Sequence, residues 1–370
     1  MSFRYSTGNS QLDLSIAEIL HRAGASEHQD MLHQMMVTVV KLAQDGAESG
    51  DLKIINSTLK EMRYAFKVMK PYRRVRKCAI FGSARCKPDT EDYKQACEFA
   101  ARIADLGYMV IPGAGHGIME AGNRGAGTER SFGLNIRLPF EQVANPYIAK
   151  DEKLVNFKYF FTRKLAFMKD THAVVCCPGG FGTHDEGLEV LTLIQTGKSH
   201  MVPIVFMHPE GSVFWSDWHQ YNVDRLLQRG MISPEDLSLY KVTSSVEEAA
   251  DEVRGFYRRY HSMRYVRDRL IVRLEAAISE EEIELLNEEF GDILKSGKIE
   301  PTLALAEEHD KTISHLPRIK FHFRRRAFGR LRELINRLNS FELPEYSSIE
   351  VPEAGEGGLL PSEMDEGSDN

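Results

Sequence analysis

The sequence lacks the features of several protein classes. It contains no apolar run near the ~18 residues that a membrane-spanning helix needs. Its N-terminus has no basic segment followed by an apolar stretch, so we expect no secretory signal. The five cysteines form no CxxC pair, and their odd number argues against a disulfide framework. Together these absences favour a protein of the reducing cytoplasm.

Positive charge is missing from the end of the chain. The formal net charge of the 370 residues is −7, but nine acidic residues and no Lys or Arg lie from Phe341 onward. The remainder of the chain is therefore close to neutral. We expect residues 341–370 to form a disordered acidic tail, because a segment rich in Pro, Gly, Ser and acids cannot bury a core.

Short apolar segments alternate with helical segments in the middle of the chain. This alternation is typical of right-handed βαβ units and predicts an α/β fold with a doubly wound, Rossmann-like parallel sheet. Ligands bind beyond the carboxyl ends of such strands. Three glycine loops follow strands, so we expect one pocket to gather them. The strands are expected at residues 78–81, 108–111, 132–136, 173–177 and 202–206.

The flanking regions have different patterns. Residues 10–70 have a helical pattern, and from Leu52 the apolar residues follow the 3, 4, 3, 4, 3 spacing of a helix-packing seam. We interpret them as a helical cover on the core or on a second subunit. Residues 264–274 predict a strand, and residues 279–289 and 325–338 predict helices. The expected domains are N-terminal helices at 1–72, the Rossmann-like domain at 73–260, a small α/β module at 261–340 and the tail at 341–370.

The run 178–186, Pro-Gly-Gly-Phe-Gly-Thr-His-Asp-Glu, joins an apolar strand to a helix. Backbone N–H groups at a glycine-rich turn into a helix N-terminus bind anions, because unpaired donors and the positive end of the dipole face one point. Glu186 adds a carboxylate beside them. The combination predicts an enzyme that acts on a phosphorylated small molecule. The alternative is a simple capping box from Thr183 to Glu186, although a plain helix start does not need three glycines.

Two familiar phosphate motifs are absent. Residues 113–117 read GxGxG after the second strand, whereas the dinucleotide fingerprint is GxGxxG after the first strand with an acid about 20 residues on. Residues 192–199 end in Gly-Lys-Ser but lack the first P-loop glycine and lie at a helix C-terminus. The loop histidines show no metal-ligand spacing. We therefore expect neither a cofactor nor a metal.

Four segments together resemble the Lonely Guy family of cytokinin-activating enzymes, which are often labelled lysine decarboxylases. They are Gly82-Ser83, residues 112–120, Arg163-Lys164 and residues 178–186, and Glu189-Val190-Leu191-Thr192 also fits. Members are Rossmann-like phosphoribohydrolases of nucleoside 5′-monophosphates that form dimers or larger oligomers. The resemblance covers about residues 75–215. It implies a cytoplasmic homo-oligomer that releases the free base and ribose 5-phosphate from AMP or a related, possibly N6-substituted, nucleotide.

The resemblance also implies site residues. Arg163 and Glu186 are the expected catalytic pair. Where the shorter plant-type enzymes carry a substrate-binding acid, this chain has residues 141–145, and Asn145 is the expected replacement. Ala114 stands where Gly is usual in the central loop. The remaining residues expected to bind substrate are Gly82, Ser83, Gly113, Gly115, Met119, Lys164, Gly179, Gly180, Phe181, Gly182, Thr183, Asp185, Glu189 and Thr192.

Other functions stay open at this point. A non-catalytic nucleotide sensor or carrier would use the same loops but would not need an acid–arginine pair. A PLP-dependent decarboxylase needs a Schiff-base lysine, and Lys164 and Lys198 lack such a context. Basic and aromatic residues at 254–273 and 318–326 allow nucleic-acid binding, but the near-neutral body favours a solvated face or a subunit interface. The acidic tail could fold onto this basic face or yield it to an anionic effector.

Overall fold

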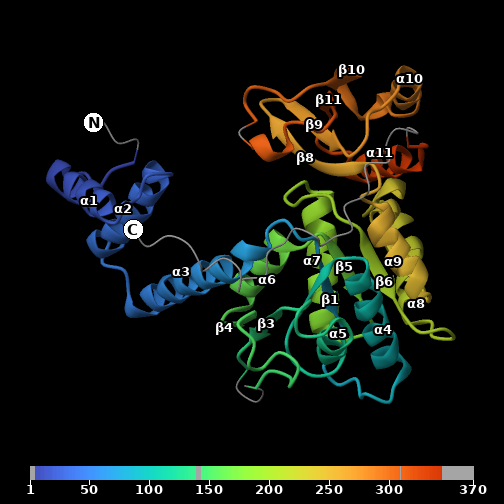
Figure 1. Ribbon diagram of the computed structural model, residues 1–370, viewed down its shortest axis with the longest axis horizontal. Helices are drawn as coiled ribbons and strands as arrows, with labels where there is room; N and C mark the ends of the chain where they lie inside the picture. The colour runs from blue at the N-terminus through green and yellow to red at the C-terminus, as the bar shows by residue number, and fades with distance from the viewer. Residues whose placement is uncertain (1–4, 139–142, 309, 344–370) are drawn as a thin grey trace, which may run out of the picture. The chain divides into compact units, whose positions relative to one another are not determined.

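The structure is a computed structural model that describes residues 5–138, 143–308 and 310–343 (Figure 1). The chain forms two compact units, Met1–Arg63 and Tyr64–Asn370, and each is considered by itself. The domain boundaries expected at residues 72, 260 and 340 stay predictions. Most of the expected acidic tail, from residue 344 onward, lies outside the described residues, as do Glu141 and Gln142.

The first unit is helical, as its sequence pattern predicts. It contains α1 (Ser10–Arg22), α2 (Gln29–Gln44) and most of α3 (Ser49–Met69). The Asn9 side chain caps α1 by accepting hydrogen bonds from the first free N–H groups. The two interruptions of the helical pattern fall at Gly24 and Gly46, which both have positive φ and therefore end a helix at little cost.

A five-stranded parallel sheet organises the second unit. Its order is β2-β1-β5-β6-β7, and all four pairings are parallel. Four of the strands are buried along their whole length, as expected for a sheet with helices on both faces. The predicted doubly wound α/β sheet is therefore confirmed. The strands are β1 (Lys77–Phe81), β2 (Met109–Pro112), β5 (Ala173–Cys176), β6 (Ile204–Met207) and β7 (Lys241–Thr243).

Two further parallel strands extend the sheet beyond β2. They are β3 (Gly133–Ile136) and β4 (Leu154–Phe157). A parallel bridge between Val110 and Ser131 joins this pair to β2. Neither β4 nor β7 is predicted by the sequence pattern, since each has only three or four residues and mixes polar with apolar side chains.

Helices connect the strands and cover the sheet (Figure 1). Thr90 caps α4 by accepting from the N–H of Tyr93. α4 packs closely on α5 and on α9, and their apolar faces join β1 and β2 in the main core. None of the described helices is long and apolar enough to cross a membrane. The bounds are α4 (Glu91–Asp105), α5 (Ile118–Ala126), α6 (Phe160–Asp170), α7 (Phe181–Gln195), α8 (Phe214–Tyr221) and α9 (Val246–Gly255).

The last part of the second unit has its own antiparallel sheet, of order β10-β11-β9-β8. The prediction of a single strand over 264–274 is wrong, because the segment is a hairpin that turns at Arg267 and Asp268. Arg267 has a φ of 55°, and a turn without Gly or Pro leaves little signal in a sequence. The elements are β8 (Tyr260–Val266), β9 (Arg269–Leu274), α10 (Glu280–Glu289), β10 (Leu294–Thr302), β11 (Arg318–Phe323) and α11 (Phe328–Ser340).

The contact between α4 and α5 requires a glycine. A Cβ atom at Gly125 would clash with the carbonyl oxygen of Cys97 and approach the Cβ of Ala100 to 2.9 Å. We expect Gly125→Ala to destabilise the second unit by about 1–3 kcal/mol through overpacking, seen as a lower thermal unfolding midpoint. The control is Gly255→Ala in α9, where no atom lies within 4 Å of the added Cβ. Equal midpoints for both variants would contradict this description of the α4–α5 contact.

Candidate functional site

The strand order reverses between β1 and β5. The chain moves from β1 to β2 on one side and returns to form β5 on the other side. Open parallel sheets bind ligands outside the carboxyl ends of their strands at such a switch point. Gly82 directly follows β1, and the loop that begins with Pro178 follows β5. The first and third glycine loops therefore lie at the position where this fold places ligands.

The three glycine loops are in direct contact, as the sequence predicts. The N–H of Ser83 donates to the carbonyl oxygen of Pro178 at 3.0 Å, and the carbonyl oxygen of Ser83 accepts from the N–H of Ile118 at 3.0 Å. A Cβ atom at Gly179 would clash with the Thr183 hydroxyl and lie 2.9 Å from the nitrogen of Ser83. Glycine is thus required where the loops pack backbone against backbone.

The central loop, 112–117, depends on unusual backbone conformations. Ala114 has a φ of 67°, in the left-handed region that favours glycine. An Ala in this conformation costs about 1 kcal/mol or more relative to Gly. Gly117 has a φ of 66°, and a Cβ there would clash with the backbone of Ser83.

Asn145 braces the central loop from behind. Its side chain is fully buried, and its amide nitrogen donates to the carbonyl oxygens of Ala114 (3.2 Å) and Gly115 (3.0 Å) and to Oδ1 of Asn123 (2.8 Å). A direct contact between Asn145 and a substrate stays a prediction. Sequence reasoning missed Asn123, which is fully buried in α5 and also donates to the carbonyl oxygen of Phe132. The sequence gives no clear signal for Asn123, because its neighbours in α5 are Gly122 and Arg124.

Arg163 and Glu186 meet between α6 and α7. Nη2 of Arg163 lies 3.5 Å from Oε1 of Glu186, and the two side chains are only 10% and 8% exposed. Among the described residues, the buried Nε of Arg163 has no hydrogen-bond partner. Its guanidinium lies over the rings of Phe160 and Phe167. A buried guanidinium with so few partners is costly, and an anionic ligand would supply the missing acceptors.

Burial alters the acid–base properties of this pair. It raises the pKa of the Glu186 carboxyl, and the charges of Arg163 and Lys164 only partly offset the effect. Burial also lowers the pKa of Arg163, against the attraction of Glu186, but a guanidinium remains charged at any working pH. The pair therefore combines a permanent cation with a carboxylate that takes up a proton more readily than an exposed one.

Lys164 of α6 forms ion pairs with two acidic residues of α7, which are Asp185 next to Glu186 and Glu189 one turn further on. Its Nζ lies 2.8 Å from Oδ2 of Asp185 and 2.6 Å from Oε2 of Glu189. Burial would lower the pKa of Lys164, but hydrogen bonds to the two carboxylates outweigh it and raise the pKa. A lysine that forms a Schiff base must reach its neutral form easily. The surroundings of Lys164 oppose that form.

The remaining predicted site residues lie on the glycine loops, α5 and α7. A Cβ at Gly113 would lie 2.5 Å from Sδ of Met119 and 3.8 Å from Nη1 of Arg163, so the central loop adjoins the pair. Phe181 is 97% exposed at the start of α7. Thr192 is exposed further along α7, where its hydroxyl donates to the carbonyl oxygen of Leu188. Roles in binding substrate stay predictions for the whole set.

The capping-box alternative for Thr183 and Glu186 is wrong. α7 begins at Phe181, its N-cap is Gly180, and no side chain caps it. Thr183 lies inside the first turn, where its hydroxyl adjoins Gly179. The first turn therefore leaves its N–H groups without a side-chain cap, as an anion site requires.

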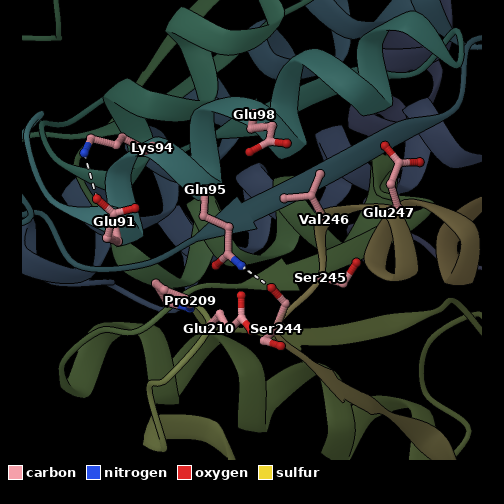
Figure 2. A pocket seen from close by; sticks show the side chains of 10 residues that line it. All are labelled: Glu91, Lys94, Gln95, Glu98, Pro209, Glu210, Ser244, Ser245, Val246 and Glu247. Atoms are coloured by element: carbon pink, nitrogen blue, oxygen red, sulfur yellow. Dashed lines mark hydrogen bonds and ion pairs between the residues drawn. The ribbon is translucent and has the colours of Figure 1, made fainter.

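A separate hollow of about 300 Å³ contains none of the predicted site residues (Figure 2). It lies between α4 and the loops that follow β6 and β7. Its lining includes Glu91, Glu98, Glu210 and Glu247. Lys94, the one cation among the described residues that line it, is paired with Glu91 at 2.7 Å. Close carboxylates repel a phosphate. This hollow is therefore unsuited to a nucleotide, and the glycine loops remain the candidate site.

Comparison with known proteins agrees with the motifs. Residues 114–253 match the family described as "Possible lysine decarboxylase". The chain is 28% identical over 101 residues to the cytokinin riboside 5′-monophosphate phosphoribohydrolase LOG1 of Arabidopsis thaliana, covering 27% of this chain and 46% of LOG1. It is 27% identical over 94 residues to the probable phosphoribohydrolase LOGL3 of Oryza sativa subsp. japonica, covering 25% and 43%. The predicted resemblance to the Lonely Guy family is confirmed, although the matches span less than half of either relative.

Matches to solved structures were also found. A molybdenum cofactor binding protein from Rippkaea orientalis is 18% identical, with a TM-score of 0.35, and the match covers 49% of this chain and 96% of that protein. The X-ray structure of TM1055 is 22% identical, with a TM-score of 0.36 and coverage of 49% and 99%. Neither likeness bears on what this chain binds.

The backbone contact between the first and third glycine loops leads to a prediction about stability. We expect Gly179→Ala to lower the free energy of unfolding by about 1–3 kcal/mol, because the new methyl group would separate Thr183 from Ser83. The matched control is Gly182→Ala in the same run, where no atom lies within 4 Å of the added Cβ. Thermal unfolding of both variants measures the difference. A loss at Gly182 as large as that at Gly179 would contradict the loop contact.

Proposed function

We propose that this chain hydrolyses the N-glycosidic bond of a nucleoside 5′-monophosphate and releases the free base and ribose 5-phosphate. The observation that carries the proposal is the buried Arg163–Glu186 pair, placed beside the glycine loops at the switch point of the sheet. A protein that only binds nucleotides has no need of an acid and an arginine buried together.

The phosphate group fits the start of α7. The N–H groups of its first turn lack a side-chain cap, and the space beside Gly180 and Gly182 is open to 4 Å. The positive end of the helix dipole adds to these donors. Binding energy from the phosphate, which does not react, would hold the ribose against the catalytic pair.

Glu186 and Arg163 would have different roles in the reaction. Cleavage of an N-glycosidic bond passes through an oxocarbenium-like state in which positive charge grows on the sugar. Ionised Glu186 would stabilise this charge or activate the attacking water. Arg163 remains cationic and would orient Glu186 or the phosphate.

Decarboxylation, which the family description suggests, is not supported by the site. Lys164 is held by Asp185 and Glu189, which favour its charged form, and Lys198 is exposed in the turn after α7. Neither lysine has the surroundings of a Schiff-base residue.

The proposed substrate is AMP or an N6-substituted AMP. Support comes from the curated relatives, whose names specify cytokinin riboside 5′-monophosphates. We also propose a homo-oligomer. Large apolar side chains stand exposed on α6 and α7, the two helices that carry Arg163 and Glu186, and exposed apolar surface of this kind would suit a contact with a second copy of the chain. They are Phe160, Phe161, Leu165, Phe181 and Leu188.

A substrate panel tests the activity. The purified chain is incubated with AMP, GMP, CMP, UMP and N6-isopentenyl-AMP, and with the matching nucleosides, and the free base and ribose 5-phosphate are measured. Release of base from monophosphates alone is the expected result. Nucleotide binding without any release would instead favour the sensor or carrier function.

The role of Glu186 leads to a mutational prediction. Glu186→Gln keeps the shape of the side chain but removes its charge, so we expect turnover of the preferred nucleotide to fall by roughly 10²-fold or more while binding is retained. The control is Glu98→Gln in the acidic hollow, which should leave turnover unchanged. Near-normal turnover of the Glu186 variant would exclude this carboxylate from the mechanism.

Lys164 provides a pH prediction. If the ionised form of Glu186 is active, the rate falls as the pH drops through its raised pKa. The charge of Lys164 lowers that pKa, so Lys164→Met should raise it and move the acidic limb of the kcat–pH profile to higher pH. Lys169→Met, which removes a charge from the same helix near Asp170, is the control. If the acidic limb does not move in Lys164→Met, the titration of Glu186 is not what causes it.

A further inference from the structure

The antiparallel sheet of residues 260–343 gathers cationic side chains at one end. The β8–β9 turn, the last residues of β11 and the irregular part of β10 meet there, because Leu270 pairs with Phe321 and Ser296 pairs with His322. We call this part of the sheet the cationic end. Its Lys and Arg residues are Arg264, Arg267, Arg269, Lys295, Lys298, Lys320, Arg324 and Arg325.

A small hollow of about 150 Å³ lies within the cationic end. Arg269, Lys298, Lys320 and His322 line it, together with Glu300, the one carboxylate among the described lining residues. Nζ of Lys320 lies 3.6 Å from this carboxylate. Among the described residues, Arg269 and Lys298 have no ion-pair partner, and both are exposed. The hollow therefore carries an excess of positive charge.

Other arginines of the same sheet and its helices are neutralised internally. Buried Glu308 binds both Arg273 and Arg318. Arg259 pairs with Glu282, and Arg332 pairs with Glu252. These cations hold the fold together. At the cationic end, Arg267 pairs with Glu307 and His322 lies near Asp268. Among the described residues, Arg269 and Lys298 have no ion-pair partner, so these two charges are available to a partner of opposite charge.

The chain itself supplies such a partner. Residues 344–370 contain eight acidic side chains and no Lys or Arg. Fully extended, these 27 residues reach roughly 90 Å. The folded part from residue 260 to 343 has an expected radius of gyration of about 12 Å. The tail can therefore reach every part of this sheet, and its attachment gives an effective concentration on the order of 1 mM.

We propose that residues 344–370 dock on the cationic end, with their carboxylates against Arg269, Lys298 and the neighbouring cations. Individual exposed ion pairs are weak, but several of them act together here and the tether removes most of the cost of association. The interaction weakens as salt screens the exposed charges.

Protection of the tail from a glutamate-specific protease tests the proposal on the full chain. Cleavage after Glu350 and Glu353 is followed by mass spectrometry and compared with a free synthetic peptide of residues 344–370. At low salt we expect the tail of the intact protein to be cut at least about fivefold more slowly than the peptide. At about 0.5 M salt the two rates should converge.

Charge reversals identify the docking surface. Arg269→Glu with Lys298→Glu should abolish protection at low salt. The matched control, Arg73→Glu with Arg74→Glu, makes the same charge change at exposed arginines elsewhere and should leave protection intact. Equal thermal midpoints verify that both variants fold. Equal cutting of tail and peptide, or an equal effect of the control, would overturn the proposal. The readout needs no catalytic activity, so it is independent of the proposed reaction.

Discussion

The chain leaves β1 toward one edge of the sheet and returns to form β5 on the other side of the same strand. Because both strands are parallel, the loops after them open at the same edge and next to each other. Two segments almost 100 residues apart, Gly82-Ser83 and Pro178-Gly179, are thereby brought within hydrogen-bonding distance. The contact is made by backbone atoms and leaves no room for a Cβ at Gly179. The rest of the site is arranged on this backbone contact.

The Arg163–Glu186 pair makes weaker contacts than the hydrogen-bonded glycine loops beside it. The Arg163–Glu186 contact is long at 3.5 Å, and Nε of Arg163 is unpaired within the described residues. A weak buried ion pair lowers the stability of the fold, and a buried N–H donor without an acceptor lowers it further. Lys164 compensates by joining α6 to α7 through Asp185 and Glu189. We infer that Lys164 carries the structural tie, which leaves Arg163 free to face a ligand.

Much of this arrangement follows from the sequence, for identifiable reasons. Buried parallel strands such as β1 and β5 are continuous apolar runs, so both the alternation and the position of the glycine loops are predictable. β4 and β7 are short and mix polar with apolar side chains, so the sequence pattern does not identify them as strands. The hairpin at Arg267 turns without Gly or Pro. The bracing role of Asn145 depends on contacts with the central loop and Asn123, and sequence spacing does not reveal such contacts.

Charge is also separated between regions of the second unit. The hollow beside α4 is lined by glutamates, whereas the start of α7 offers uncapped N–H groups, and its buried Glu186 lies beside the guanidinium of Arg163. An anion that approaches this unit is repelled from the first and attracted to the second. Under the proposed function, backbone donors at the start of α7, where Phe181 and Gly182 are exposed, would recognise the phosphate. A bulky or charged group in place of Gly182 would then obstruct the N–H groups that are proposed to bind the phosphate.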